Sequence, residues 1–128
     1  MPDTEKITIN MSAVDLGKVD LLVQEGLYSN RTDLIRTAIR NQLDKHNVEI
    51  QQSVVRHAFG LGMFHYDRSD FEKVKANGKK LDISIIGMLD LSYNIMPELA
   101  DEVVASIQVR GIFQASEEVK KILADRMK

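Results

Sequence analysis

Three polar residues near the start of the 128-residue sequence are separated by single apolar residues: Lys6, Thr8 and Asn10. This alternation is the period of a β-strand with one buried and one exposed face. An ammonium group, a hydroxyl and a carboxamide on one face can donate and accept hydrogen bonds. These side chains could therefore recognise a polar surface, such as the edges of nucleic-acid bases.

The sequence gives little support for metal binding or catalysis. His46, His57 and His65 invite comparison with metal sensors, but they lack a tight His-x-His or His-x3-His spacing, and the chain has no cysteine. We therefore expect these histidines on the surface or at an interface, with no metal and no cofactor. No phosphate loop, nucleophile elbow or Glu/His metalloenzyme motif occurs, so the sequence does not predict an enzyme.

Capping residues delimit two helices after the strand. Ser12 starts a helix over about residues 13–25, and Gly26 ends it. Ser29 or Asn30 caps a second helix, which ends near residue 46 or continues to about residue 56, because no Gly or Pro interrupts the pattern. The expected buried faces are Leu16, Val19, Leu22 and Val23 in the first helix and Leu34, Ile35, Ala38, Ile39 and Leu43 in the second.

The predicted strand has no partner within residues 1–46. Alone it can neither satisfy its backbone groups nor bury Ile7, Ile9 and Met11. We expect it to pair with the same strand of another copy, which gives a two-stranded antiparallel ribbon above four helices. Such a ribbon fits the DNA major groove.

The order of these elements resembles a known family. An alternating strand over residues 6–12, a capped helix, a Gly-containing turn and a second helix opening on Ser-Asn-Arg-Thr-Asp are similar to CopG-type ribbon-helix-helix proteins, relatives of the Arc and MetJ repressors. The resemblance covers about the first third of the chain. It implies a transcriptional regulator that binds double-stranded DNA as a homodimer.

The resemblance also implies roles for six residues. Bases would be read by Lys6, Thr8 and Asn10, and a phosphate would be held by the backbone amides around Ser29, Asn30 and Arg31. Interpretations without any DNA contact stay open. The ribbon face could be only the solvated side of a dimer, and the residues at the start of the second helix cap it with or without DNA. Arg36 and Arg40 are more typical of a solvated face.

Net charge sets a condition on DNA binding. The chain has a formal net charge of −2, and residues 1–46 contain six Lys and Arg against seven Asp and Glu. Attraction by bulk charge is therefore excluded, and any contact with DNA must be local.

An internal repeat organises the second half. Residues 83–92 align with residues 107–116, and residues 58–66 form a fainter third copy. Each copy is strand-like and precedes a helix-like segment, which predicts a small parallel sheet with right-handed crossovers. A glycine stands at the equivalent position of each copy: Gly62, Gly87 and Gly111. These glycines could admit a ligand, but bending strands or letting helices pack is the favoured interpretation.

Local signals place the helices of the repeat. Ser69 with Glu72 predicts a capping box for the first, Pro97 opens the second, and Ser116 opens the third. Helices on one face leave Ile86, Met88 and Ile112 on or near the other. Because parallel sheets are normally covered on both faces, we expect that side to meet another subunit or the long helix.

The sequence thus predicts an α+β fold with two modules. Residues 1–46 form a ribbon-helix-helix DNA-binding domain, and residues 58–128 form a small α/β repeat module for oligomerisation or sensing. No apolar run reaches the roughly 18 residues of a membrane span, and no signal region is present, so we expect a cytoplasmic protein without membrane contact.

The leading function is a sequence-specific repressor in bacteria, whose residues 58–128 either assemble it beyond a dimer or sense a signal. The alternative is an antitoxin-type autoregulator whose C-terminal module neutralises a protein partner. Antitoxin tails are usually disordered until bound, whereas this region has the pattern of a folded module. A purely structural oligomer that never meets DNA is the third hypothesis.

Overall fold

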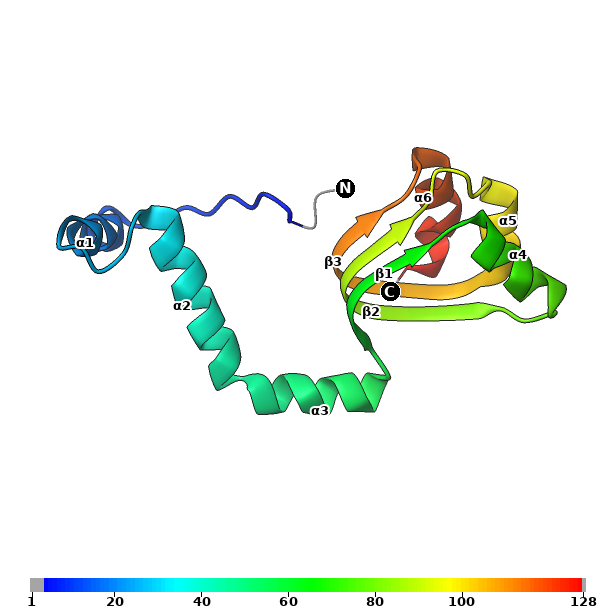
Figure 1. The fold of residues 1–128 in the computed structure, drawn as a ribbon, viewed down its shortest axis with the longest axis horizontal. Helices are drawn as coiled ribbons and strands as arrows, with labels where there is room; N and C mark the ends of the chain where they lie inside the picture. The colour runs from blue at the N-terminus through cyan, green and yellow to red at the C-terminus, as the bar shows by residue number, and fades with distance from the viewer. Residues whose placement is uncertain (1–3, 128) are drawn as a thin grey trace. The chain divides into compact units, whose positions relative to one another are not determined.

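The computed structural model describes residues 4–127, which divide into two compact units. Residues 6–53 form the first unit, and residues from 54 onward belong to the second. The described part of the chain contains six α-helices and one parallel three-stranded sheet, so the fold is α+β (Figure 1).

Both helices at the start of the first unit begin at capping side chains. The Ser12 hydroxyl accepts a hydrogen bond from the amide three residues later and starts α1 (Ala13–Gln24), which is followed by Gly26 at φ +82°. The Asn30 side chain does the same for α2 (Arg31–Lys45). Of the two predicted caps for this helix, Asn30 is therefore the N-cap.

The second helix does not continue as one element. It ends at His46, whose φ of −102° and ψ of 18° leave the helical region, and α3 (Asn47–His57) follows directly. The prediction that the chain stays helical to about residue 56 is confirmed, but the prediction of one continuous helix is wrong. Asn47 stands at the break, and its side chain favours helix ends over helix interiors because it competes for backbone hydrogen bonds. The His46 ring lies 3.2 Å from Gln42 Nε2 and 3.5 Å from Glu49 Oε2, so its contacts span the break.

The second unit alternates strands and helices along the chain. Its elements, in chain order, are β1 (Gly60–Tyr66), α4 (Arg68–Ala76), β2 (Leu81–Leu91), α5 (Pro97–Val103), β3 (Val104–Gln114), α6 (Glu117–Leu123) and the 3-10 turn η1 (Ala124–Arg126). All strands are parallel, in the order β1-β2-β3, which confirms the strand-helix alternation predicted by the repeat. Figure 1 shows α4, α5 and α6 on one face of the sheet, inside the curve that its strands make.

The core of this unit lies between the sheet and the three helices. Fully buried side chains come from both layers, among them Phe71 of α4, Leu89 of β2, Ile107 of β3 and Leu123 of α6. Each such side chain contributes about 1.5–3 kcal/mol by leaving water. The repeat therefore builds a core within a single chain.

Two predicted helix starts in this unit are confirmed and one is wrong. Pro97 is the first residue of α5, and Ser116 caps α6. Helix α4 instead begins after Asp67, which forms a reciprocal capping box with the residue three positions on. An ionised carboxylate is a stronger acceptor than the predicted cap Ser69, whose hydroxyl donates to Asp67, while Glu72 pairs with a neighbouring arginine.

The three equivalent glycines lie side by side across the sheet. Gly62 pairs with Gly87, and Gly87 with Gly111, with φ values of +137°, +134° and +129°. A Cβ at Gly87 would collide with the carbonyl oxygen of Gly62, and one at Gly111 with that of Gly87. Only glycine adopts this backbone without strain. The arrangement favours the interpretation that these glycines bend the strands, which curve sharply in Figure 1.

Candidate nucleic-acid interface

The predicted base-reading residues lie in the segment that precedes α1. Residues 4–12 belong to no helix or strand of the single chain, and Lys6, Thr8 and Asn10 are exposed. At the alternate positions Ile7 is 72% and Ile9 58% exposed. Two large apolar side chains in solvent mark a surface that the described chain cannot cover by itself.

The helices of the first unit leave a matching surface unburied. Val19 is the only buried residue that the structure describes in residues 6–53. Leu22, Leu34 and Ile35 of the predicted core faces are half-buried, and Ile39 and Leu43 are exposed. Further exposed apolar side chains on or beside these helices are Val14, Leu21 and Leu27. So small a core by itself contributes little to the stability of this unit.

The start of α2 already holds one carboxylate. The Ser29 amide and hydroxyl each donate to Asp33 Oδ2 at 3.0 Å, and the Asn30 side chain accepts from the Asp33 amide at 2.8 Å. The hydrogen bonds from Ser29 hold the pKa of Asp33 below its ordinary value. Both donors of Ser29 are thus engaged within the chain. The amides of Arg31 and Thr32 lie in the first turn, where no carbonyl of the helix can accept from them.

Arg31 is held by an acid on the preceding helix. Its Nε lies 2.7 Å from Asp20 Oδ1 and its Nη2 2.9 Å from Asp20 Oδ2, a bidentate pair that joins α2 to α1. The side chains stay 56% and 49% exposed. Hydrogen bonding to Arg31 lowers the pKa of Asp20, and the same contact raises the pKa of Arg31. A phosphate would therefore have to compete with Asp20 for the Arg31 guanidinium.

The acidic partners of this site were not predicted from the sequence. Asp20 lies on the first helix, and its partner is eleven positions away. No periodicity links residues on different helices. Asp33 did carry a signal, because an acid in the first turn of a helix commonly accepts amide hydrogen bonds near the N-terminus.

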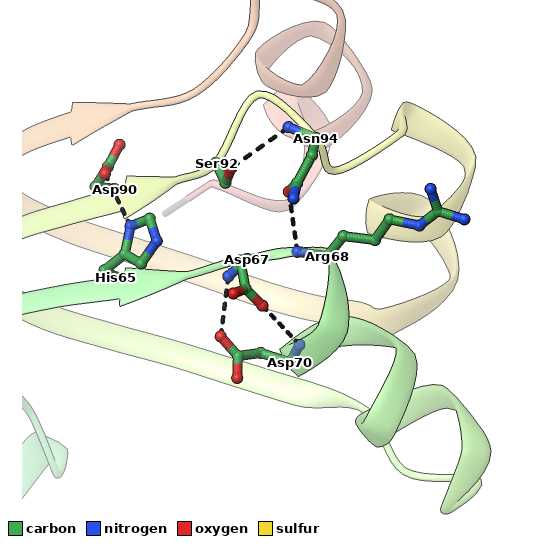
Figure 2. Close-up of polar contacts among 7 residues, drawn as sticks. All are labelled: His65, Asp67, Arg68, Asp70, Asp90, Ser92 and Asn94. Atoms are coloured by element: carbon green, nitrogen blue, oxygen red, sulfur yellow. Dashed lines mark hydrogen bonds and ion pairs between the residues drawn. The ribbon is translucent and has the colours of Figure 1, made fainter.

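A polar network at the carboxyl ends of β1 and β2 serves the turns there. Figure 2 shows Asp67 and Asp70 exchanging their capping hydrogen bonds, and Asn94 Oδ1 accepting from the Arg68 amide at 3.0 Å. The side chains of Asp67, Asp70, Ser92 and Asn94 all accept from backbone amides, and the Arg68 guanidinium pairs with Glu72. The network therefore supplies no vacant set of ligands.

The histidines are dispersed. His57 packs edge-on against Phe59, and His65 Nδ1 lies 2.9 Å from Asp90 Oδ2 (Figure 2). Within residues 4–127 no group of three or more His, Cys, Asp or Glu residues could hold a metal ion. Nor is any helix in this described part long and apolar enough to cross a membrane.

One comparison with known proteins gives a match. The model of the ribbon-helix-helix transcriptional regulator family matches residues 2–120. This span includes the extended segment, the first unit and nearly all of the second. No curated protein and no solved structure matches the chain.

Proposed function

Because the chain belongs to the ribbon-helix-helix transcriptional regulator family, we propose that it is a sequence-specific repressor of the CopG type. The family regulates transcription by binding DNA, so the chain is a DNA-binding regulator and not an enzyme. In this proposal a homodimer inserts the antiparallel ribbon of its two N-terminal segments into the major groove, in the bacterial cytoplasm.

The observation that carries the proposal is the unburied apolar surface of residues 6–53. Ile7 and Ile9 face solvent on the segment, and Ile39 and Leu43 face solvent on α2. Pairing two segments would give each strand its hydrogen-bond partner and turn its apolar face onto the helices. The same alternation would turn Lys6 and Asn10 outward, towards DNA.

Base readout is assigned to the outward side chains. Asn10 can make a bidentate contact with adenine, and Lys6 can contact the acceptors of guanine; Thr8 can bond to several bases. These contacts require no net positive charge, which agrees with the acidic balance of the chain.

Phosphate contact is assigned to Ser29, Asn30 and Arg31 at the start of α2, where backbone amides and the helix dipole favour an anion. The intramolecular bonds refine this assignment. Ser29 would have to release Asp33, and the Arg31 side chain would have to leave or share Asp20. The amides of Asn30 and Arg31 are the more direct anchors.

Residues 58–128 are proposed to assemble dimers further or to sense a signal. The antitoxin-type alternative is less favoured, because this region has its own core around residues such as Phe71 and Leu123 rather than the pattern of a tail that folds on its partner.

The test is recovery of genomic fragments bound in cells, followed by binding of purified variants to the enriched site. Asn10→Ala should cost roughly 1–3 kcal/mol on that site and relax preference at one base pair per half-site, with little effect on random DNA. Arg31→Ala should weaken binding to all duplexes alike and flatten the salt slope by about one unit for each phosphate that is no longer neutralised. No enriched sequence, with no salt-dependent binding, would refute the proposal in favour of a structural oligomer.

A further inference from the structure

The outer face of the second unit's sheet, opposite α4, α5 and α6, carries an apolar band. Buried Ile85 and Leu89 of β2 point to the helices, so the side chains between them point outward. An open hollow of about 400 Å³ runs over the glycine row on this face. Its apolar lining consists of Leu61, Met63, Ile86, Met88 and Ile112. Leu61 is 59% and Met63 65% exposed, which is unusual for a parallel sheet.

A polar row borders the band on one side. His65, Asp90 and Gln114 lie in register on the outer face. One carboxylate oxygen of Asp90 bonds to His65, but Asp90 Oδ1 and Gln114 Oε1 are buried and have no hydrogen-bond partner among the described residues. A buried acceptor without a donor costs roughly 1–3 kcal/mol. The Asp90 side chain as a whole is 13% exposed, so this row presents a carboxylate on the outer face.

The other side of the band carries the matching donor. Arg110 lies on β3, in register with Ile86 of β2. It is exposed and forms no ion pair within residues 4–127. It lies two residues before Ile112, and Gln114 lies two residues after it. The cation and the unpaired acceptors are therefore placed symmetrically about the row formed by Met63, Met88 and Ile112.

This symmetry makes the face complementary to itself. Consider a two-fold axis that runs along the row of Met63, Met88 and Ile112, perpendicular to the strands. This axis places Arg110 of one copy over Gln114 of the other, beside Asp90. We propose that the outer face packs against the same face of a second copy, with each Arg110 guanidinium paired with the Asp90 carboxylate of the other copy and lying over Gln114. Such an isologous contact forms every interaction twice, and a guanidinium can donate two hydrogen bonds to one carboxylate.

The interface deepens the assembly role proposed for residues 58–128, and it does not require DNA. Sheets that pack face to face stand about 10 Å apart, with their side chains interdigitating. The glycine row leaves room between the flanking side chains for those of the other copy. The apolar band would supply the buried centre, and the two polar rows would set the register.

Crosslinking of the full chain tests the geometry directly. The sequence has no cysteine, so a single introduced thiol reports one position. Met63→Cys places it on the proposed axis, where the two copies of this residue come closest. Tyr93→Cys is the matched control, because Tyr93 is 74% exposed in the turn after β2 and does not line the hollow. A short bis-maleimide should convert Met63→Cys largely to a covalent dimer and leave Tyr93→Cys as single chains; equal yields would overturn the proposal.

A charge reversal tests the polar contact. In the Met63→Cys background, Arg110→Glu should lower the crosslink yield about tenfold, because it sets a carboxylate against Asp90 and like charges across an interface are costly. Lys121→Glu makes the same change in charge on α6, away from the outer face, and should leave the yield unchanged. An unchanged yield with Arg110→Glu would contradict the assigned donor.

These outcomes are separable from the DNA-binding proposal. Crosslinking is measured without DNA, so its failure leaves the ribbon untouched. Loss of sequence preference in ribbon variants would in turn leave the Met63→Cys crosslink intact.

Discussion

The two units of this chain differ in how much of their fold one chain can complete. In residues 6–53 the structure describes one buried side chain, Val19, whereas the second unit has a core contributed by both sheet and helices. Both have well-formed, capped helices. Local signals thus specify secondary structure equally in the two units, while burial separates a module with its own core from one that leaves most of its apolar side chains exposed.

The largest expected effect comes from a residue that is exposed in the single chain. Ile9→Asp should abolish dimerisation, because burial of each Ile9 in the ribbon is expected to stabilise the dimer by about 1.5–3 kcal/mol, twice per dimer. Sedimentation of residues 1–46 checks this, with a melting temperature that rises with concentration for the unchanged sequence. Asn41→Asp in the same segment is the control, since Asn41 is also exposed but lies on α2, outside the ribbon. A concentration-independent melt of the unchanged 1–46 segment would refute the dimer.

The second unit should respond in the opposite way. Phe71→Ala removes a fully buried ring and should cost about 3–5 kcal/mol in the free energy of unfolding. Chemical denaturation of the full chain measures it. The destabilisation should not vary with protein concentration, because the core lies within one chain. A value below about 1 kcal/mol would mean that this core is not what holds the unit together.

The next largest effect is expected from replacing a glycine. Gly87→Ala should destabilise the second unit by about 2–4 kcal/mol, because φ is +134° and the new methyl group meets the Gly62 carbonyl oxygen. Gln108→Ala on the neighbouring strand is the control and should have a small effect. Equal unfolding transitions for the two variants would show that the strands can bend without glycine.

The smallest expected effect concerns the ion pair between the helices of the first unit. Asp20→Asn frees the Arg31 guanidinium and removes a negative charge, so affinity for all duplexes should rise by less than about tenfold and the salt slope should steepen. Asp15→Asn on the same helix removes the same charge away from Arg31 and serves as the control. An equal gain in both variants would indicate a general charge effect instead of release of Arg31.

Sequence patterns predicted those features that depend on neighbouring residues. Ser12 and Ser116 were found as caps because a cap acts on amides two or three positions away, and the glycine register followed from the repeat. The missed features depend on competition or on distance. Asp67 displaced Ser69 as a cap because the carboxylate is the stronger acceptor, and Asp20 meets Arg31 only through the packing of two helices.

The break between α2 and α3 shows a further reason for error. The apolar pattern continues through His46, so periodicity gives no sign of a stop, and the change in backbone angles is confined to one residue. The unpaired acceptors of Asp90 and Gln114 could not be predicted either, since they follow from the register of β2 and β3.

The most direct test of the account is the full chain with Lys6, Thr8 and Asn10 all replaced by alanine. These side chains are exposed and should be dispensable for folding, so the variant should remain dimeric by sedimentation. It should lose its preference for the genomic site and bind it no better than random DNA, while keeping the salt-dependent binding that its phosphate contacts provide. A dimeric variant with its sequence preference intact would show that the ribbon does not enter the groove.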